Sequence, residues 1–489
     1  MKKKLIGLSD IRRHFYRNEV PYWFVSATPF NLLGMDEWVR EFTYVNLLDC
    51  FDGHHPRTLV PPRDKDHVFE SIEEITNHLL RHKDFVDAVE RSGPGGKAVF
   101  LFFDEETESI CKELGLQVCF PPAKLRQEMD SKIMTTRIGD EAGVPSVPNT
   151  LGKVSDYKSL VALANKAKIG SDLVVQTAFG DSGHTTFFIA SEDDYQKYAE
   201  EIEAEKEVKI MKRIRCKGAA LEACVTRHGT IVGPLMTELV GFKELTPYRG
   251  GWCGNEVNDQ AFAPKVREQA RDYTFKFGEA LKKRGYRGYF EVDYLIDLDS
   301  DQLYLGEVNP RVTGASSMTN LAAFAHADAP LFLFHLLEYG DVDFELDVAA
   351  LNDRWADPDN IDDWGQLVIK FTKDEIQHVT KAPASGVYEI QPDGTLQYVR
   401  MQTHRRTAQS ANRAFFLRIV GEGDYFYEGA DLGILVSRGR LMTEDFELNE
   451  RGRAWTKGIR ALYEGVPLVK AREQEIAAKV ADIGGFKML

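Results

Sequence analysis

Four oxygen-bearing side chains on either side of a polar turn have the types and spacing of a metal site. Glu291 and Asp293 precede the turn near Ser300, and Glu307 and Asn309 follow it. The flanking residues predict two strands, and a symmetric turn would place Asp293 opposite Glu307 and the other two residues opposite each other. Carboxylates stacked in this way repel one another unless they hold a cation. Oxygen ligands suit Mg²⁺ or Mn²⁺ rather than zinc, and a solvated acidic hairpin is the alternative.

A glycine-containing turn, Gly180-Asp-Ser-Gly-His-Thr-Thr186, is the second candidate for chemistry. Glycines and small hydroxyl residues let backbone N–H groups approach phosphate oxygens closely. The turn lacks the Gly-Lys-Ser/Thr end of a Walker A loop, and an ordinary hairpin loop is the alternative.

Residues near the acidic hairpin could contact a substrate. The Arg311 guanidinium, two residues after Asn309, could stabilise negative charge on an intermediate, and a salt bridge to the acidic face is the alternative. The small-residue loop at 313–319 suits close contact with a substrate carboxylate or acyl phosphate. The glycine-containing loop at 248–255 could recognise a side chain or carboxylate, and a surface loop is its alternative. The substrate candidates in these loops are Arg249, Trp252, Gly314 and Ser316.

The elements that position these residues begin with an open α/β unit. The apolar run 98–103 predicts a buried parallel strand. A helix at 104–114 follows, with Asp104 as N-cap and Gly115 after its end, and 116–120 is the next strand. Strand, helix and strand in this order indicate an α/β unit.

The middle of the chain alternates helices and strands. One helix is predicted from Pro121 to Ala142. The other expected helices are 155–167, 191–206 and 264–284, and the expected strands are 173–177, 186–190, 207–214, 220–226 and 230–239.

The last third of the chain is predicted to be mainly strands. Residues 340–363 hold many aspartates and few apolar residues, so a domain boundary is expected there. A helix is predicted near 451–463, and the expected strands are 366–371, 386–390, 396–401, 415–420 and 432–437.

The composition is typical of a globular protein, and the length suggests more than one domain. The 489 residues are 43% hydrophobic and 28% charged, and the net charge of −15 argues against nonspecific binding to nucleic acid or to an anionic membrane. The apolar stretches are too short for a signal peptide or a membrane span. Six scattered cysteines without a Cys-x-x-Cys pair make a disulfide framework or zinc site unexpected, so the cytoplasm is the expected compartment.

Three elements in order resemble the ATP-grasp superfamily, which includes biotin carboxylase, D-alanine–D-alanine ligase and the L-amino acid ligases. Glu-Val-Asn-Pro-Arg at 307–311 is similar to the family's metal-binding hairpin, and the turn at 180–186 to its triphosphate-covering loop. The stretch from Asp130 to Pro145 resembles a helix whose lysine, here Lys132, contacts nucleotide phosphates. The resemblance covers roughly residues 95–335.

The resemblance implies a fold class of α/β and α+β, in three domains. A pre-ATP-grasp α/β domain would span 1–125. The ATP-grasp domain would span 126–340, with a glycine-loop subdomain at about 150–215. A C-terminal mainly β domain would span 341–489.

The resemblance also implies which residues bind ATP and metal. Asp293 matches the first metal ligand best, although the turn is about two residues longer than usual and Glu291 competes with it. The other implied metal ligands are Glu307 and Asn309. Lys132 and Arg311 would act in catalysis. The implied nucleotide-binding residues are Lys132, Gln176, Gly180, Ser182, Gly183, His184, Met211, Lys212, Ile214 and Glu222, with Glu222 on the ribose side.

The chain departs from the family pattern at two places. Gln176 stands where the family usually has a second lysine, which weakens the expected grip on phosphate. The acidic pair usual at the adenine hinge is missing from the segment 211–214.

The implied activity is an ATP-dependent carboxylate–amine ligase acting on small-molecule substrates. It would form an amide or peptide bond through an acyl phosphate and release ADP and phosphate. A biotin carboxylase-like enzyme is the nearest alternative, but the arginine-histidine-glutamine-lysine stretch expected of it is not found at 248–255. A non-catalytic nucleotide-binding regulator is a further alternative, motivated by Gln176. Relatives are often dimers, so a homodimer is also considered.

Overall fold

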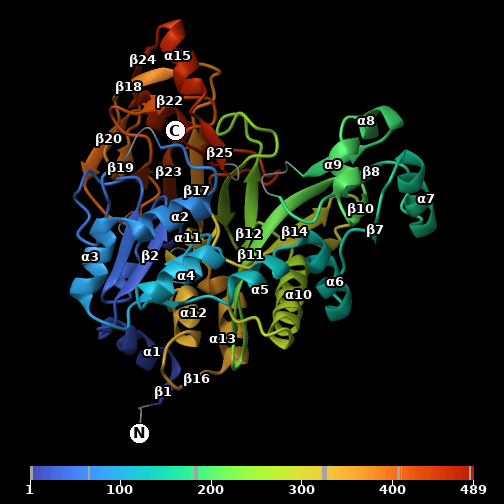
Figure 1. Ribbon diagram of the computed structural model, residues 1–489, viewed down its shortest axis with the longest axis horizontal. Coiled ribbons are helices and arrows are strands. Elements are labelled where there is room, and N and C mark those ends of the chain that lie inside the picture. Colours follow the sequence, from blue (N-terminus) through green and yellow to red (C-terminus); the bar gives the residue numbers. More distant parts are fainter. Residues whose placement is uncertain are drawn as a thin grey trace.

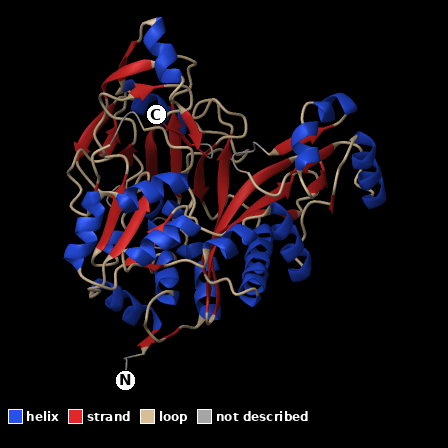
Figure 2. Ribbon diagram, in the orientation of Figure 1, coloured by secondary structure: helices blue, strands red, loops and turns tan. Residues whose placement is uncertain are grey.

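The computed structural model describes residues 4–63, 67–180, 185–321, 328–404, 408, 410–483 and 486–488. A central ten-stranded sheet is flanked by a five-stranded sheet on one side and a four-stranded sheet on the other (Figures 1 and 2). In the described segments, no helix has the length and apolar character needed to cross a bilayer.

The N-terminal part is a parallel sheet in the order β4-β3-β2-β5-β6. Its strands are β2 (Tyr22–Ser26), β3 (Phe42–Asn46), β4 (Thr58–Leu59), β5 (Lys97–Phe100) and β6 (Gln117–Val118), and its helices are α1 (Gly7–Tyr16), α2 (Ile72–Arg81), α3 (Lys83–Ser92) and α4 (Glu105–Glu113). The predicted unit β5-α4-β6 is confirmed, and the Asp104 side chain caps α4 by accepting a hydrogen bond from the Thr107 N–H at 2.8 Å.

The single helix predicted from Pro121 to Ala142 is wrong, because the chain forms two helices there. They are α5 (Ala123–Met129) and α6 (Lys132–Ala142). Ser131 lies between them in an extended conformation, and its hydroxyl accepts a hydrogen bond from the Met134 N–H, which starts a new helix. Lys132 is therefore the first residue of α6 rather than an interior one.

A small four-stranded sheet, in the order β7-β10-β8-β9, projects from the molecule with its helices (Figure 1). Its strands are β7 (Asn149–Gly152), β8 (Leu173–Gln176), β9 (Thr186–Ile189) and β10 (Val208–Lys212), and its helices are α7 (Tyr157–Ala167), α8 (Glu192–Gln196) and α9 (Ala199–Ala204). The segment 191–206, expected as one helix, is therefore two short ones. The strands predicted at 207–214 and 220–226 are confirmed, but they lie in different sheets.

The central sheet runs in the order β15-β14-β11-β12-β13-β17-β23-β21-β19-β20. Its strands are β11 (Cys216–Thr226), β12 (Gly229–Val240), β13 (Trp252–Val257), β14 (Gly288–Asp297), β15 (Leu303–Asn309), β17 (Trp364–Lys370), β19 (Gly386–Ile390), β20 (Leu396–Arg400), β21 (Arg413–Arg418) and β23 (Asp431–Arg438). The long helix α10 (Pro264–Lys283) packs on β11 and β12.

The sheet is continuous across the expected domain boundary at residues 340–363, because β13 pairs with β17. That segment also contains α13 (Val348–Ala356), whose Leu351 and Trp355 are buried. The domain limits inferred from the sequence stay a prediction. The remaining strands and α-helices are β1 (Leu5–Ile6), α11 (Ser316–Leu321), α12 (Phe332–Glu338), β16 (Phe344–Glu345), β18 (Gln377–Lys381), β22 (Tyr425–Phe426), α14 (Glu450–Ala461), β24 (Glu464–Pro467), α15 (Lys470–Ala477), β25 (Ala481–Ile483) and β26 (Phe486–Met488).

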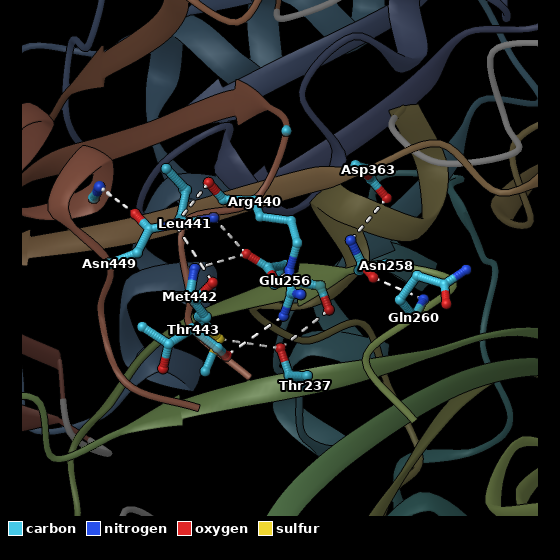
Figure 3. A network of polar contacts seen from close by, with 12 residues as sticks. Thr237, Glu256, Asn258, Gln260, Asp363, Arg440, Leu441, Met442, Thr443 and Asn449 are labelled. Carbon is cyan, nitrogen blue, oxygen red and sulfur yellow. Dashed lines mark hydrogen bonds and ion pairs between the residues drawn. The ribbon is translucent and has the colours of Figure 1, made fainter. Parts of the chain in front are cut away.

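A buried carboxylate on β13 ties the C-terminal part to the rest of the sheet (Figure 3). Glu256 accepts hydrogen bonds from the Met442 N–H at 3.0 Å and from Arg440 Nε at 3.2 Å. Nearby, Asn258 donates to Asp363 at 2.9 Å. The Glu256 contacts hold the segment after β23 against β13, and the Asn258 contact joins the end of β13 to the start of β17.

A buried histidine joins the N-terminal sheet to the central one. His335 Nδ1 accepts a hydrogen bond from the Tyr289 N–H at 2.9 Å, so Nε2 carries the proton and donates to the Cys119 carbonyl at 2.6 Å. Burial lowers the pKa of His335 to about 3. The ring is therefore neutral in the folded protein at pH 7 and at pH 5.

Lowering the pH from 7 to 5 should reduce the free energy of unfolding by about 2 kcal/mol through His335 alone. In the unfolded chain this histidine has its usual pKa of about 6.5, so it binds a proton below that pH, whereas the buried ring of the folded protein does not. Above that pH the ring is neutral in both states. Urea unfolding of wild type and His335→Asn at several pH values measures this. The exposed His54, replaced by Asn, is the control. If His335→Asn kept the wild-type pH dependence, the assignment would be contradicted.

Candidate active site

Acidic side chains from three adjacent strands lie on one face of the central sheet. Glu291 is in register with Asn309, and Asp293 with Glu307, as the sequence predicted. Glu222 of β11 lies opposite Glu291, so it extends the same row. The opposite face is apolar and packs against α10.

The predicted register depends on a bulge at Gly306. Asp293 pairs with Glu307, but Tyr294 pairs with Leu305, so Gly306 is an extra residue on β15 between these two pairs. A Cβ at position 306 would lie 2.8 Å from the Asp293 carbonyl oxygen, so the bulge needs glycine. The bulge thus keeps the acidic residues of both strands on the same face.

Asn309 connects the two competing first metal ligands. Its amide nitrogen donates to Asp293 Oδ2 at 3.0 Å and to Glu291 Oε2 at 3.3 Å. Its amide oxygen accepts a hydrogen bond from Arg311 Nη2 at 2.9 Å. Both carboxylates therefore remain candidates, because each adjoins Asn309.

The carboxylates of the acidic row are buried close to one another, which disfavours their charged forms. Burial, followed by the charges of Glu222 and Glu238, raises the pKa of Glu291 well above its ordinary value. Burial and neighbouring carboxylates, Glu291 first, act in the same direction on the pKa of the partly buried Asp293. Carboxylates in such a place are neutralised either by protons or by a bound cation.

The donor set fits a hard divalent cation, because carboxylate and amide oxygens are its preferred ligands. In the described segments no group of three or more acidic, histidine or cysteine side chains is gathered closely enough to hold a metal ion. Glu307 instead pairs with Lys132 at 2.9 Å, and the Asn309 amide bridges the other two carboxylates.

Lys132 lies between the acidic row and the glycine turn. Its ammonium donates a hydrogen bond to the Gly180 carbonyl, and its backbone N–H donates to the Ala178 carbonyl at 2.8 Å. Gly180 has a φ of +129° and closely approaches Thr185, so other residues would be strained there. The expected phosphate contacts Ser182, Gly183 and His184 lie outside the described residues.

The sequence reasoning missed Lys209 of β10, which is fully buried. Its ammonium lies 3.5 Å from the Gly306 carbonyl oxygen. Burial lowers the pKa of Lys209 to about 8, while Glu307 acts in the opposite direction. A lysine between the apolar residues Val208 and Ile210 was the available signal.

The expected adenine hinge lies where the chain passes from the small sheet to the central one. Met211 is buried in a cluster with Val147 and Val174, and Ile214 packs against this cluster. Lys212 is exposed at the end of β10. Since Leu295 and Tyr304 of the hairpin also contact the cluster, an apolar wall adjoins the acidic row.

Glu222 and Ser316 belong to one buried hydrogen-bond network beside the acidic row. Glu222 is fully buried and accepts hydrogen bonds from Tyr289 Oη at 2.5 Å, Ser316 Oγ at 2.6 Å and Thr313 Oγ1 at 3.2 Å. Burial raises the pKa of Glu222 to about 7. The two side chains therefore help to hold the loop after β15 in place, and their expected roles at the ribose and the substrate stay predictions.

Arg311 is held beside Asn309 and over an aromatic ring from the N-terminal part. Its guanidinium carbon lies 4.3 Å from the centroid of the Phe102 ring. Its Nε is buried, and within the described chain it has no hydrogen-bond partner. An ion pair with the acidic face, the alternative considered from the sequence, is not among the described contacts. Arg311 therefore has an unused donor beside the acidic row.

The loop expected at 248–255 is partly a strand, because residues from Trp252 onward pair with β12 and β17. The Trp252 ring lies so close to Gly314 that a Cβ there would be 2.3 Å from it. Arg249 is exposed in the preceding turn. The structure thus brings together two of the four substrate candidates, Trp252 and Gly314.

Comparison with known proteins identifies proteins of similar sequence and fold. No family model matches the chain. Methylcrotonoyl-CoA carboxylase subunit alpha, mitochondrial, from Arabidopsis thaliana is 25% identical over 228 residues, which are 45% of this chain and 30% of that protein. The chain spans about a third of the length of the methylcrotonoyl-CoA carboxylase subunits that it matches.

Two solved structures resemble nearly the whole chain. Biotin carboxylase from Campylobacter jejuni has a TM-score of 0.57 and 13% identity, over 92% of this chain and 93% of that one. Carboxyaminoimidazole ribonucleotide synthase from Aspergillus clavatus has a TM-score of 0.52 and 12% identity, over 86% and 94%. The resemblance predicted from the acidic hairpin, the Lys132 helix and the glycine turn is therefore confirmed: this chain has the ATP-grasp fold of these structures.

Proposed function

We propose that this protein is an ATP-dependent carboxylate–amine ligase, which forms an amide or peptide bond and releases ADP and phosphate. The observation that carries the proposal is the acidic row of β14 and β15 beside the Lys132 ammonium. It lies next to Gly180 and to the apolar wall where two sheets meet. The structure from Aspergillus clavatus that shares this fold is a complex with ATP, which supports ATP as the proposed ligand.

In the proposed reaction, a substrate carboxylate oxygen attacks the γ-phosphorus of ATP. The bond to ADP breaks and an acyl phosphate forms. The amine nitrogen then attacks the acyl carbon, loses a proton and displaces phosphate. Lys132 would offset the charge of the phosphates, and Arg311 the charge that develops at the reacting centre.

Mg²⁺ is the proposed metal, with Mn²⁺ as the alternative. Glu307, Asn309 and either Asp293 or Glu291 would hold it. When bound, the ion neutralises charge on the phosphate oxygens. Ser182, Gly183 and His184 are proposed to cover the phosphates, and Met211, Lys212 and Ile214 to contact adenine.

A biotin carboxylase-like activity is the second candidate, because the matched curated relatives are carboxylase subunits. We place it second because the expected arginine-histidine-glutamine-lysine stretch is not found at 248–255.

All six cysteines are free thiols, in keeping with the proposed cytoplasmic location. The proposed partners are small-molecule substrates and, as a homodimer, a second copy of the chain.

The proposal predicts phosphate release that requires one acid and one amine together. Purified protein with ATP and Mg²⁺ is tested against a panel of amino acids and organic acids, with and without a second amine, and mass spectrometry identifies the product. Release driven by bicarbonate would instead establish the carboxylating activity. ATP binding without turnover across the whole panel would support the non-catalytic regulator.

A further inference from the structure

Lys209 is a buried cation with little to neutralise it. Among the described residues its only hydrogen bond is to the Gly306 carbonyl, at 3.5 Å, which is the outer limit of such a bond. Glu307 and Asp140 are the carboxylates close enough to act on it. Glu307 already pairs with Lys132 at 2.9 Å, and Asp140 is exposed. Buried charges are normally paired, so this arrangement lacks an anion.

The register of the small sheet places Lys209 beside position 176, where this chain lacks the second lysine of the family pattern. Lys209 of β10 is directly opposite Gln176 of β8. Directly opposed residues of antiparallel strands point to the same face of the sheet. Gln176 itself donates to Thr186 Oγ1 at 3.1 Å, beside the glycine turn. An ammonium from β10 thus occupies the face that a lysine at position 176 would use.

Two ammonium groups, from Lys132 and Lys209, therefore lie close to one carboxylate, that of Glu307. Like charges held together in a buried place repel, and an anion that contacts both relieves the repulsion. The polyphosphate of a nucleoside triphosphate carries several negative oxygens and suits such a pair. A lysine that only braced the two sheets would be expected to make short hydrogen bonds, which Lys209 lacks among the residues that the structure describes.

We propose that Lys209 binds the polyphosphate of the nucleotide, and so replaces from β10 the positive charge that Gln176 does not provide on β8. The inference rests on the proposed function, because it assumes that a nucleoside triphosphate occupies this site. According to this proposal, the glutamine at position 176 does not cost the site a positive charge, because β10 supplies the charge instead of β8.

The test is the affinity for ATP and for AMP, measured by isothermal titration calorimetry on the full chain. Lys209→Gln should bind ATP about 10- to 100-fold more weakly, the loss typical of one charge-assisted hydrogen bond. AMP, which lacks the β- and γ-phosphates, should bind as it does to wild type. Lys206→Gln, an exposed lysine on the approach to β10, is the matched control. Lys209→Met is used if the glutamine variant does not fold.

A charge relocation makes a stronger prediction, because the lysine should work from either strand. The double variant Gln176→Lys/Lys209→Gln should recover at least about tenfold of the lost ATP affinity. Wild-type ATP affinity in Lys209→Gln, an equal loss for ATP and AMP, or no recovery in the double variant would each overturn the inference.

The outcomes also separate this inference from the proposed function. Wild type that binds ATP but has no ligase activity refutes the function, and the Lys209 comparison still decides the inference. Wild type that binds no ATP refutes both. A ligase whose ATP affinity is unchanged in Lys209→Gln refutes the inference alone.

Discussion

Glu307→Gln should reduce ATP-dependent phosphate release by at least about 10³-fold, because a metal ligand that neutralises phosphate charge supplies several kcal/mol of transition-state stabilisation. The substitution keeps the size of the side chain and removes the charge that pairs with Lys132 at 2.9 Å. Steady-state phosphate release with the acid and amine identified in the panel measures the effect. Thermal unfolding shows whether the variant is folded.

The same hairpin provides the control for Glu307→Gln. Asp301 lies in the turn, is exposed, and has a φ of +53°, which asparagine tolerates better than most residues. Asp301→Asn should therefore retain wild-type phosphate release. Loss of activity in both variants would point to disruption of the hairpin. Retained activity in Glu307→Gln would contradict the assignment of Glu307 as a metal ligand.

Arg311→Met should lower kcat by about 10²- to 10³-fold with little change in the affinity for ATP, since a donor aimed at developing charge acts in the transition state. The Arg311 guanidinium is held by Asn309 at 2.9 Å and by the Phe102 ring, and its buried Nε has no hydrogen-bond partner among the described residues. Arg311→Lys should recover only a small part of the loss, because an ammonium cannot reproduce the planar fork. The kcat and the ATP affinity are measured separately for each variant.

Arg215 is the matched control for Arg311, because it is an exposed arginine paired with Asp299 at 3.1 Å. Arg215→Met should leave both kcat and ATP affinity unchanged. If Arg311→Met weakened ATP binding and left kcat unchanged, Arg311 would be a binding residue only. Wild-type behaviour in both quantities would mean that the guanidinium only packs against Phe102.

The sequence by itself determined the local geometry of the acidic hairpin. Side chains alternate along a strand, so the pairs Glu291 with Asp293 and Glu307 with Asn309 had to share faces once two strands formed. The end of α4 and its Asp104 cap were equally readable, because capping involves residues close in sequence. The order of the three motifs that resemble ATP-grasp proteins also predicted the fold, because each motif is a continuous stretch of sequence.

Some local features were still misread from the sequence. Ser131 interrupts the helix predicted up to Ala142, since a serine in an apolar-periodic stretch can either continue a helix or cap a new one. The few apolar residues of 340–363 gave no sign of a helix, yet the segment forms α13, in which Trp355 is buried. Few apolar residues suffice for packing when each is large and fully covered.

Only the tertiary structure decided which distant residues share the site. Lys209 lies close to Lys132 and Glu307 because the small sheet packs against the hairpin of the central sheet, and contacts between segments so far apart in sequence leave no local signal. Glu222 and Ser316, which looked accessible, are buried against each other because the loop after β15 folds onto β11. The sequence therefore determined which side chains each element presents, whereas the packing of sheets decided which of them are accessible and which charges lie close enough to act together.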